Sequence, residues 1–346
     1  MTASKIEWTD RSDWNPIRGC TRVSRGCGGP GKAGGCYAER IAARFSDPGQ
    51  PFHSFAKRVN GEARWTGKVA LIEDRLTEPL RWRKPAKIFV CSTADLFHEA
   101  LPDGAIDQVF AVMALCPQHT FQILTKRPER MAQYFLDPGR IREQEIGRAL
   151  LSLGRNHGTT DPLAGFYLPL PNVWLGVSVE DQATADARIP VLLRTPAAKR
   201  FISAEPLLGP VDLGAIVRKC TFDGTIHADG KTHPIGWVIA GGESGPGARP
   251  AHPDWFRALR DQCAAASVPF FFKQWGSWFP TIDRDVDDPD WRWGYTVVRD
   301  QPARYCFLNL AGGCGFHGER VHLMQRYAKR ATGAILDGRE HREFPL

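Results

Sequence analysis

VWLGVSVE, at residues 173–180, is an apolar run rich in β-branched and aromatic side chains that ends in a carboxylate. Five more runs follow the same pattern: IFVCST at 88–93, FQILTK at 121–126, RFISAE at 200–205, GWVIAGGE at 236–243 and PFFFKQ at 269–274. Nearly continuous apolar runs of this length suit strands that are covered on both faces, as in a parallel sheet. The sequence therefore predicts six buried strands.

Helical patterns lie between these runs. Ile106, Val109, Phe110 and Met113 fall at i, i+3, i+4 and i+7, and Trp255, Phe256, Leu259 and Cys263 form a similar stripe behind Pro253. Pro128 stands where a first helical turn is expected to begin. Strands that alternate with helices predict an α/β fold, either a complete or partial (β/α) barrel or a doubly wound sheet.

Polar residues at the ends of the runs favour the barrel. In such barrels the carboxyl ends of the strands form the mouth of the active site, so side chains distant in sequence converge there. The strand-end residues expected at this mouth are Thr93, Asp95, Lys126, Arg127, Ser178, Glu180, Glu205, Gly241, Gly242, Glu243, Lys273 and Gln274.

The chain divides into two parts by pattern. Residues 1–280 are expected to form the barrel, with a cysteine-rich loop near its start, and residues 281–346 a C-terminal insertion and extension packed on it. The segments 210–235 and 281–318 resemble insertions, because they are rich in Gly, Asp and Pro and show no sustained period. IREQEIGRALLSL, within 138–171, predicts a surface helix.

Composition excludes several classes of protein. The 346 residues are 42% hydrophobic and 24% charged, which excludes fibrous, collagenous and wholly disordered chains. No apolar stretch approaches the roughly 18 residues that cross a bilayer, and the first residues lack the apolar run of a secretion signal, so we expect a cytoplasmic protein. The net charge of +7 is compatible with a polyanionic partner such as nucleic acid, and equally with a mildly basic enzyme.

Three of the nine cysteines, Cys20, Cys27 and Cys36, lie within 17 residues of a glycine-rich segment. Ala38, Ile41, Ala42 and Phe45 follow at helical spacing, so a helix is expected to begin almost at Cys36. A flexible loop lets sulfur atoms converge, and the positive end of a helix lowers the pKa of a thiol. Three thiolates on one loop of a protein in a reducing compartment favour a metal site over disulfides.

The number of ligands separates the candidate metals. A structural zinc site needs four protein ligands, so it would need a fourth such as His53 or His98. A cubane iron–sulfur cluster takes one ligand per iron, and three cysteines leave one iron for a small molecule, which favours the cluster. Ordinary loop cysteines remain the third alternative. Cys91, Cys116 and Cys263 fall on strand or helix patterns and are expected in the core.

Motifs along most of the chain carry a resemblance to a known family. They are WNP at 14–16, GCYAER at 35–40, DLFHE at 95–99, LTKRP at 124–128, GVSVED at 176–181, ISAEPLLGP at 202–210, GGESG at 241–245, FFKQWG at 271–276 and LDGREHREFP at 336–345. Together they resemble a phage-associated family of three-cysteine proteins, largely uncharacterised, which in turn resembles radical S-adenosylmethionine (SAM) enzymes. Those enzymes typically use C-x3-C-x2-C, whereas this chain has C-x6-C-x8-C, with the insert GGPGKAGG before the third cysteine.

The resemblance implies a partial or complete (β/α) barrel of radical SAM type, in which Cys20, Cys27 and Cys36 hold three irons of a [4Fe-4S] cluster and SAM occupies the fourth. An electron donor such as a flavodoxin or ferredoxin is then expected, and the reaction would start from a 5′-deoxyadenosyl radical. A nucleic acid or nucleotide substrate is suggested by net charge and phage association. The alternative is a nucleic-acid-binding protein stabilised by zinc or iron–sulfur, without radical chemistry.

Barrel position then assigns roles to the strand-end residues. Thr93 and Asp95 are expected to accept from the SAM amino group, and Ser178 and Glu180 to hold the ribose hydroxyls. Two further sets are expected to complete the site. The cofactor or substrate wall would be formed by Glu205, Gly241, Gly242 and Glu243, and an anionic substrate or the SAM carboxylate would be bound by Lys126, Arg127, Lys273 and Gln274.

Overall fold

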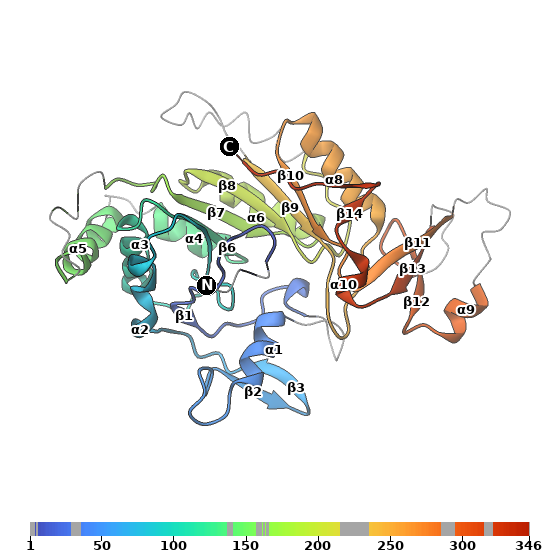
Figure 1. The fold of residues 1–346 in the computed structure, drawn as a ribbon, viewed down its shortest axis with the longest axis horizontal. Coiled ribbons are helices and arrows are strands. Elements are labelled where there is room, and N and C mark those ends of the chain that lie inside the picture. The colour runs from blue at the N-terminus through green and yellow to red at the C-terminus, as the bar shows by residue number, and fades with distance from the viewer. Residues whose placement is uncertain are drawn as a thin grey trace.

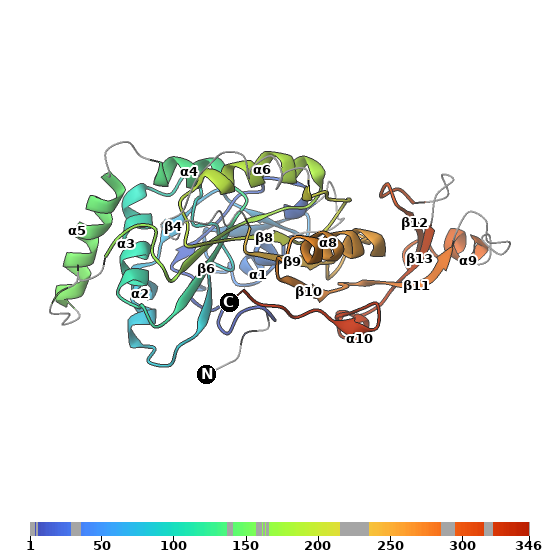
Figure 2. The same ribbon diagram turned by 90° about the horizontal axis from the view of Figure 1, so that it is seen from above.

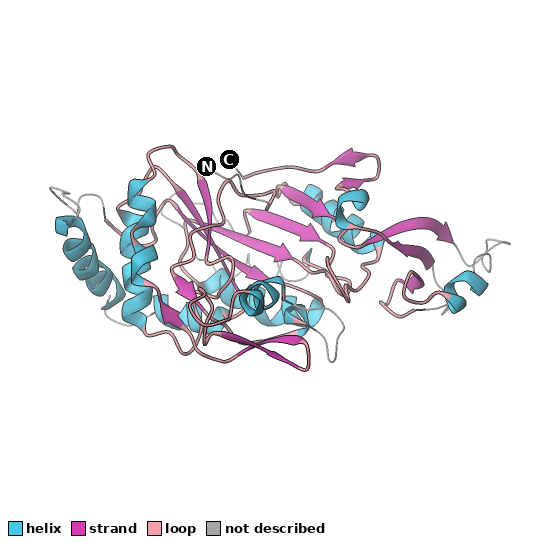
Figure 3. Ribbon diagram, turned by 60° about the horizontal axis from the view of Figure 1, so that its bottom comes forward, coloured by secondary structure: helices cyan, strands magenta, loops and turns pink. Residues whose placement is uncertain are grey.

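The computed structural model describes residues 4, 6–28, 36–136, 141–156, 161, 163, 166–214, 235–284, 295–314 and 321–345. At its centre lies a six-stranded parallel sheet (Figures 1 and 3). Its strands follow one another in chain order: β5 (Lys87–Val90), β6 (Thr120–Thr125), β7 (Val173–Ser178), β8 (Lys199–Ala204), β9 (Trp237–Gly241) and β10 (Phe270–Gln274). The six predicted strands are confirmed.

The sheet is an open half-barrel, because its order runs from β10 to β5 without a pairing between these two strands. Chain segments from the two termini lie along its edges. Arg11 pairs with Ile88 of β5, and Arg342 pairs with Phe271 of β10. Each edge strand therefore has a hydrogen-bonding neighbour, which removes the open edges at which sheets associate.

Helices cover the outer face of the sheet. They are α3 (Asp103–Ala114), α4 (Pro128–Phe135), α6 (Gln182–Arg194) and α8 (Pro253–Ala265), and α5 (Ile141–Asn156) packs on α3. In Figure 2, α4 and α6 lie along one side of the sheet and both chain ends lie on the other. The two predicted apolar stripes are buried, and Pro128 and Pro253 stand in the first turns of α4 and α8 as expected. The side chain of Asp181 caps α6 through Thr184.

Helix α5 is less exposed than the sequence suggests. Ile146 and Leu150 are fully buried, and the helix packs on α3. In the described part of the chain no helix is long and apolar enough to span a bilayer.

Aromatic side chains fill the inner face of the half-barrel. Phe89, Phe201, Trp237 and Phe271 come from four of its strands, and Trp8 enters from the N-terminal segment. Trp8 and Trp237 meet edge to face, with ring centroids 6.1 Å apart. Since the interior is packed by these rings, the space left for a ligand lies at the carboxyl ends of the strands.

A small subdomain precedes the sheet. It contains β1 (Ile17–Arg18), η1 (Arg25–Cys27), α1 (Tyr37–Arg44), β2 (Ala56–Val59), β3 (Glu62–Trp65), β4 (Ala70–Leu71), α2 (Glu73–Leu76) and η2 (Glu78–Arg81). The helix expected after Cys36 is present, but only part of its apolar stripe is buried. Ala42 packs against the β2–β3 hairpin, whereas Ile41 and Phe45 are exposed.

The C-terminal part forms a second sheet of three antiparallel strands, in the order β11 (Trp278–Arg284), β13 (Val321–Arg326), β12 (Tyr305–Asn309). Three shorter elements follow or interrupt it: α9 (Tyr295–Asp300), α10 (Lys329–Thr332) and the β14 (Ile335–Leu336)–β15 (Arg339–Glu340) hairpin, which turns at Asp337.

This second sheet corrects the prediction of an aperiodic insertion at 281–318, which contains β12 and the end of β11. The expected boundary at residue 280 falls inside β11. Pro280 lies at a bulge there, and the bulge breaks the alternation by which a strand is recognised. Most of the predicted insertion at 210–235 lies outside the described residues.

Candidate functional site

A cavity of about 430 Å³ opens at the carboxyl ends of the parallel strands. We call it the main pocket. All the predicted site residues except Glu180 and Gly241 line it: Cys20, Cys27, Cys36, Thr93, Asp95, Lys126, Arg127, Ser178, Glu205, Gly242, Glu243, Lys273 and Gln274. Side chains from six strand ends and one loop therefore converge on one space, as the barrel geometry predicted.

The three cysteines reach the pocket from separate points of one segment. Cys20 follows β1, Cys27 ends η1, and Cys36 precedes α1 as its N-cap. The backbone N–H of Cys36 donates to the carbonyl of Cys27 at 3.1 Å, which brings the ends of the insert together. The lengthened spacing between the second and third cysteines thus leaves both at the same cavity.

Burial raises the pKa of two of these thiols, Cys20 and Cys36. It raises the pKa of Cys20 to about 12, with the Asp95 charge adding to the shift and Arg127 opposing it. Burial also raises the pKa of Cys36, although backbone N–H groups of Glu39 and Ala38 at the start of α1 act in the opposite direction. The helix start does lower the pKa of Cys36, as expected, but burial outweighs it. A metal ion binding here would displace protons from these thiols.

The histidines considered as zinc ligands do not join the cysteines at the main pocket. Among the described residues, one group of three potential ligands has atoms that all lie within 4.8 Å of one another, and it is His252, Asp254 and His322 rather than the cysteines. The histidines considered as a fourth zinc ligand do not line the pocket: His98 contacts Thr21 Oγ1 at 2.9 Å, and His53 contacts the carbonyl of Ser46. Neither histidine therefore supplies the fourth ligand that a structural zinc site at these cysteines would need.

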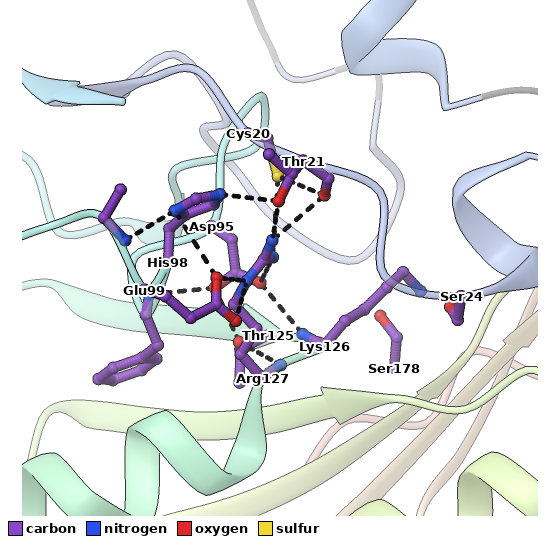
Figure 4. A network of polar contacts seen from close by, with 12 residues as sticks. Cys20, Thr21, Ser24, Asp95, His98, Glu99, Thr125, Lys126, Arg127 and Ser178 are labelled. Atoms are coloured by element: carbon purple, nitrogen blue, oxygen red, sulfur yellow. Dashed lines mark hydrogen bonds and ion pairs between the residues drawn. The ribbon is translucent and has the colours of Figure 1, made fainter. Parts of the chain in front are cut away.

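Arg127 fixes the start of the cysteine loop (Figure 4). Its side chain is buried, and its guanidinium donates to Thr21 Oγ1 at 2.8 Å and approaches Cys20 Sγ at 3.8 Å. On the opposite side it is held by Asp95 Oδ2 at 3.0 Å and by both carboxylate oxygens of Glu99. Arg127 therefore connects the loop to the strand ends.

Asp95 orients Arg127 and the turn around it. Its carboxylate accepts from Arg127, from Thr125 Oγ1 at 2.7 Å, and from the backbone N–H groups of Phe97 and Lys126. The bond from Phe97 is the turn cap that a short acidic side chain commonly provides. In this structure the carboxylate is fully engaged by the protein.

Glu180 lies beneath the cysteine loop rather than on the pocket wall. It is fully buried and accepts from Lys126 Nζ at 2.5 Å, Ser24 Oγ at 2.8 Å and Arg188 at 3.0 Å. Burial by itself would raise the pKa of this carboxyl, but the charges of Lys126 and Arg188 lower it overall. A Cβ at Gly26 would stand 2.3 Å from Glu180 Oε1, so only glycine lets the loop approach this carboxylate so closely.

The opposite wall comes from β8, β9 and β10. Lys273 Nζ lies 3.1 Å from Glu205 Oε1. The groups that approach Gly241 and Gly242 closely belong to the protein and not to a ligand. A Cβ at Gly241 would meet the Glu205 carboxylate, and a Cβ at Gly242 would meet the Trp275 carbonyl. Glu243 is held by the guanidinium of Arg249 through both of its oxygens.

A family model described as "Protein of unknown function (DUF5131)" matches residues 3–345. The chain belongs to the DUF5131 family. No curated protein and no solved structure matches it.

The DUF5131 chain also uses residues that sequence reasoning did not assign to the site. Asn15 Oδ1 accepts from the backbone and hydroxyl of Thr93 and from Ser92 Oγ, so it organises the end of β5. Asn15 is the second residue of the WNP motif, which could have drawn attention to it in the sequence. Cys91 was expected in the core; it is buried there, and it also lines the pocket.

Two side chains that line the pocket, Trp8 and Gln274, each have a buried polar atom without a hydrogen-bond partner among the described residues. Gln274 Oε1 is buried and accepts no hydrogen bond. Since buried acceptors are normally satisfied, this atom is suited to receive a donor from a bound ligand. The pocket thus combines thiols, cations, carboxylates and an unused acceptor, a set that suits a small polar ligand.

Proposed function

We propose that this protein is a radical SAM-like enzyme that holds a [4Fe-4S] cluster through Cys20, Cys27 and Cys36. One observation carries the proposal: three cysteines of one loop line the same cavity as the polar strand ends of a parallel half-barrel. Three cysteines leave one iron of a cubane cluster without a protein ligand, and that iron is then available to a small molecule. Neither His53 nor His98 lines the pocket as a fourth ligand, which supports a cluster over a structural zinc ion.

The pocket has the volume and chemistry for SAM beside the cluster. Its volume lies within the range of about 300–1,000 Å³ typical of small-molecule sites. Apolar and aromatic groups, including Trp8, Phe89 and Leu124, offer a surface for an adenine ring. Lys273 and Glu205 present charges of both signs, as required by a ligand with an amino and a carboxylate group.

When bound, the cluster supplies one electron to cleave the sulfonium bond of SAM, and a flavodoxin or ferredoxin is the donor class we propose. The protein's own part is to position SAM and to shield the reaction from water. Arg127 holds the loop through Thr21 and lies beside Cys20, where its charge favours the thiolate. Glu180 holds Lys126 and Ser24 in place below the loop. Ser178 and Gln274 remain to hydrogen-bond the ligand, whereas Asp95 acts through Arg127.

A nucleic acid or nucleotide is the substrate class we propose. The net charge of +7 favours a polyanion. The β2–β3 hairpin adds a local argument, because Trp65 lines the main pocket while Lys57 and Arg58 on the neighbouring strand are exposed. Exposed cations beside an aromatic side chain are typical of surfaces that bind phosphates and bases.

Anaerobic reconstitution with iron and sulfide tests the proposal. We expect a brown protein with about four irons per chain, which forms 5′-deoxyadenosine from SAM after reduction. Cys20→Ser should abolish both readouts. The matched control is Cys91→Ser, which changes a cysteine on the same pocket that is assigned to the core and should retain the iron.

Two results would contradict the proposal. A colourless protein that binds zinc at these cysteines would exclude the cluster. A cluster that forms without any 5′-deoxyadenosine would favour the alternative, an iron–sulfur-stabilised nucleic-acid-binding protein.

A further inference from the structure

A second group of potential metal ligands lies away from the main pocket, where the C-terminal sheet meets α8. His252 is the N-cap of α8, Asp254 lies in its first turn, and His322 lies on β13 opposite Leu308. Their ligand atoms all lie within 4.8 Å of one another. None of the three lines the main pocket.

The Asp254 carboxylate lies close to both imidazole rings. Asp254 Oδ2 lies 3.8 Å from His252 Nδ1 and 4.0 Å from His322 Nε2, and the centroids of the two rings are 4.6 Å apart. The other oxygen, Oδ1, accepts from the Arg257 guanidinium at 2.7 Å. Arg257 thus orients the carboxylate in the way that outer-shell groups commonly orient a metal ligand.

We propose that His252, Asp254 and His322 bind a zinc ion that joins β13 to the start of α8. Two neutral imidazoles and one carboxylate are nitrogen and oxygen donors of the kind that zinc accepts. His252 Nδ1 accepts from the backbone N–H of Asp254 at 3.2 Å, and the ion would replace that N–H as its partner. With zinc–ligand bonds of about 2.0–2.2 Å, tetrahedral ligand atoms stand about 3.3–3.6 Å apart. The Asp254 carboxylate, at 3.8 and 4.0 Å from the two imidazoles, and the rest of the group, within 4.8 Å, would have to close around the ion.

Charge and burial also fit this proposal. The positive end of α8 disfavours a cation, and the Asp254 carboxylate in the first turn offsets that effect. Both histidines are almost completely buried, while Asp254 is 23% exposed, so water can complete the coordination from its side. Two histidines and a carboxylate also hold iron(II) in open sites of oxygenases. Three protein ligands and a water are the coordination of an open zinc site, so a structural role for the ion rests on its position between β13 and the start of α8 and not on the number of its ligands.

The zinc ion would stabilise the docking of the C-terminal sheet. His322 shares its sheet with Cys306, Leu308 and Met324, which pack with Trp278 and Ala248. His252 lies beside Trp255, whose indole donates to the Leu310 carbonyl after β12. A zinc ion bound to both His252 and His322 would therefore link the start of α8 to β13.

Zinc binding in the absence of the cysteine site is the test. The variant Cys20→Ser/Cys27→Ser/Cys36→Ser, stripped with a chelator and titrated with zinc alone, should still bind one equivalent, with a rise in Tm of several degrees. Cobalt should give the visible bands of nitrogen and oxygen ligation without a thiolate charge-transfer band. This result does not depend on the proposed radical chemistry.

Variants of the ligands give graded outcomes. Asp254→Asn and His322→Gln, each in the triple-cysteine background, should abolish stoichiometric binding, and Arg257→Ala should weaken it by about 10–100-fold. His53→Gln, which changes an exposed histidine elsewhere, should bind like the parent. Circular dichroism checks that each variant is folded. The proposal is overturned if the triple-cysteine variant binds no zinc, or if the folded Asp254→Asn variant binds it as well as the parent does.

Discussion

The two candidate metal centres of this protein differ in donor type and in access. The cysteine centre offers three soft thiols on a loop, and it faces a cavity of about 430 Å³. The His252–Asp254–His322 centre offers nitrogen and oxygen donors from the ends of regular elements, and its imidazoles are buried. Catalytic metal sites keep a position open, whereas structural ones are closed. The cysteine centre opens on space for a ligand, whereas the His252–Asp254–His322 centre is enclosed by protein except at the partly exposed Asp254.

The largest expected effect is the loss of iron when one thiol is removed. Cys36→Ser should reduce iron content and visible absorbance after anaerobic reconstitution to background, because the cluster loses one of three ligands. His322→Gln should leave both unchanged, since it belongs to the other centre. Equal loss of iron in both variants would show that the centres are not independent.

Arg127→Met should destabilise the protein by about 3–5 kcal/mol, because Asp95 would be left as a buried charge without its cation. The matched control is Arg130→Met, in the first turn of α4, of which Arg127 is the N-cap. Arg130 pairs with Asp103, which is 43% exposed, so its loss should cost at most about 1 kcal/mol. Urea unfolding of the metal-free variants measures both values. Similar costs for the two arginines would contradict the role of Arg127 as the buried anchor of the loop.

Gly26→Ala should cost about 1–3 kcal/mol and lower the iron content, because the added Cβ would overlap the Glu180 carboxylate. In contrast, a Cβ at Gly104 of α3 meets nothing within 4 Å, and Gly104→Ala should stabilise the protein by about 0.5–1 kcal/mol. Thermal unfolding and iron content report the two effects. Wild-type stability and iron content in Gly26→Ala would exclude the close packing of the loop on Glu180.

The smallest effect is a dependence of stability on pH. The pKa of Cys20 is raised to about 12 in the metal-free fold, above its unfolded value of about 8.5. Its contribution is therefore fully present below pH 8.5 and is lost as the pH rises toward 12, with a slope of up to about 1.4 kcal/mol per pH unit.

Metal-free Cys20→Ser should accordingly lose less unfolding free energy than the parent between pH 8.5 and 10. Chemical denaturation at several pH values measures the difference between the two proteins. His322→Gln should keep the parental slope. An unchanged slope in Cys20→Ser would contradict the burial of a neutral thiol at this position.

The sequence alone determined the framework and the identity of the thiol loop. Strands covered on both faces leave continuous apolar runs, and helices that pack on one side leave stripes, so both were readable from residue order. The polar residues after those runs were also correctly expected to converge, because parallel strands end at one edge of the sheet.

Only the tertiary structure decided what each of those residues touches. Glu180 was expected to line the site, but it lies off the pocket and holds Lys126 and Ser24, whereas Asp95 lines the pocket and also holds Arg127. His252 and His322 come from segments with no shared pattern, and β11 is disguised by the bulge at Pro280. Contacts of this kind depend on side-chain direction and on packing between distant segments, neither of which is recorded by local periodicity.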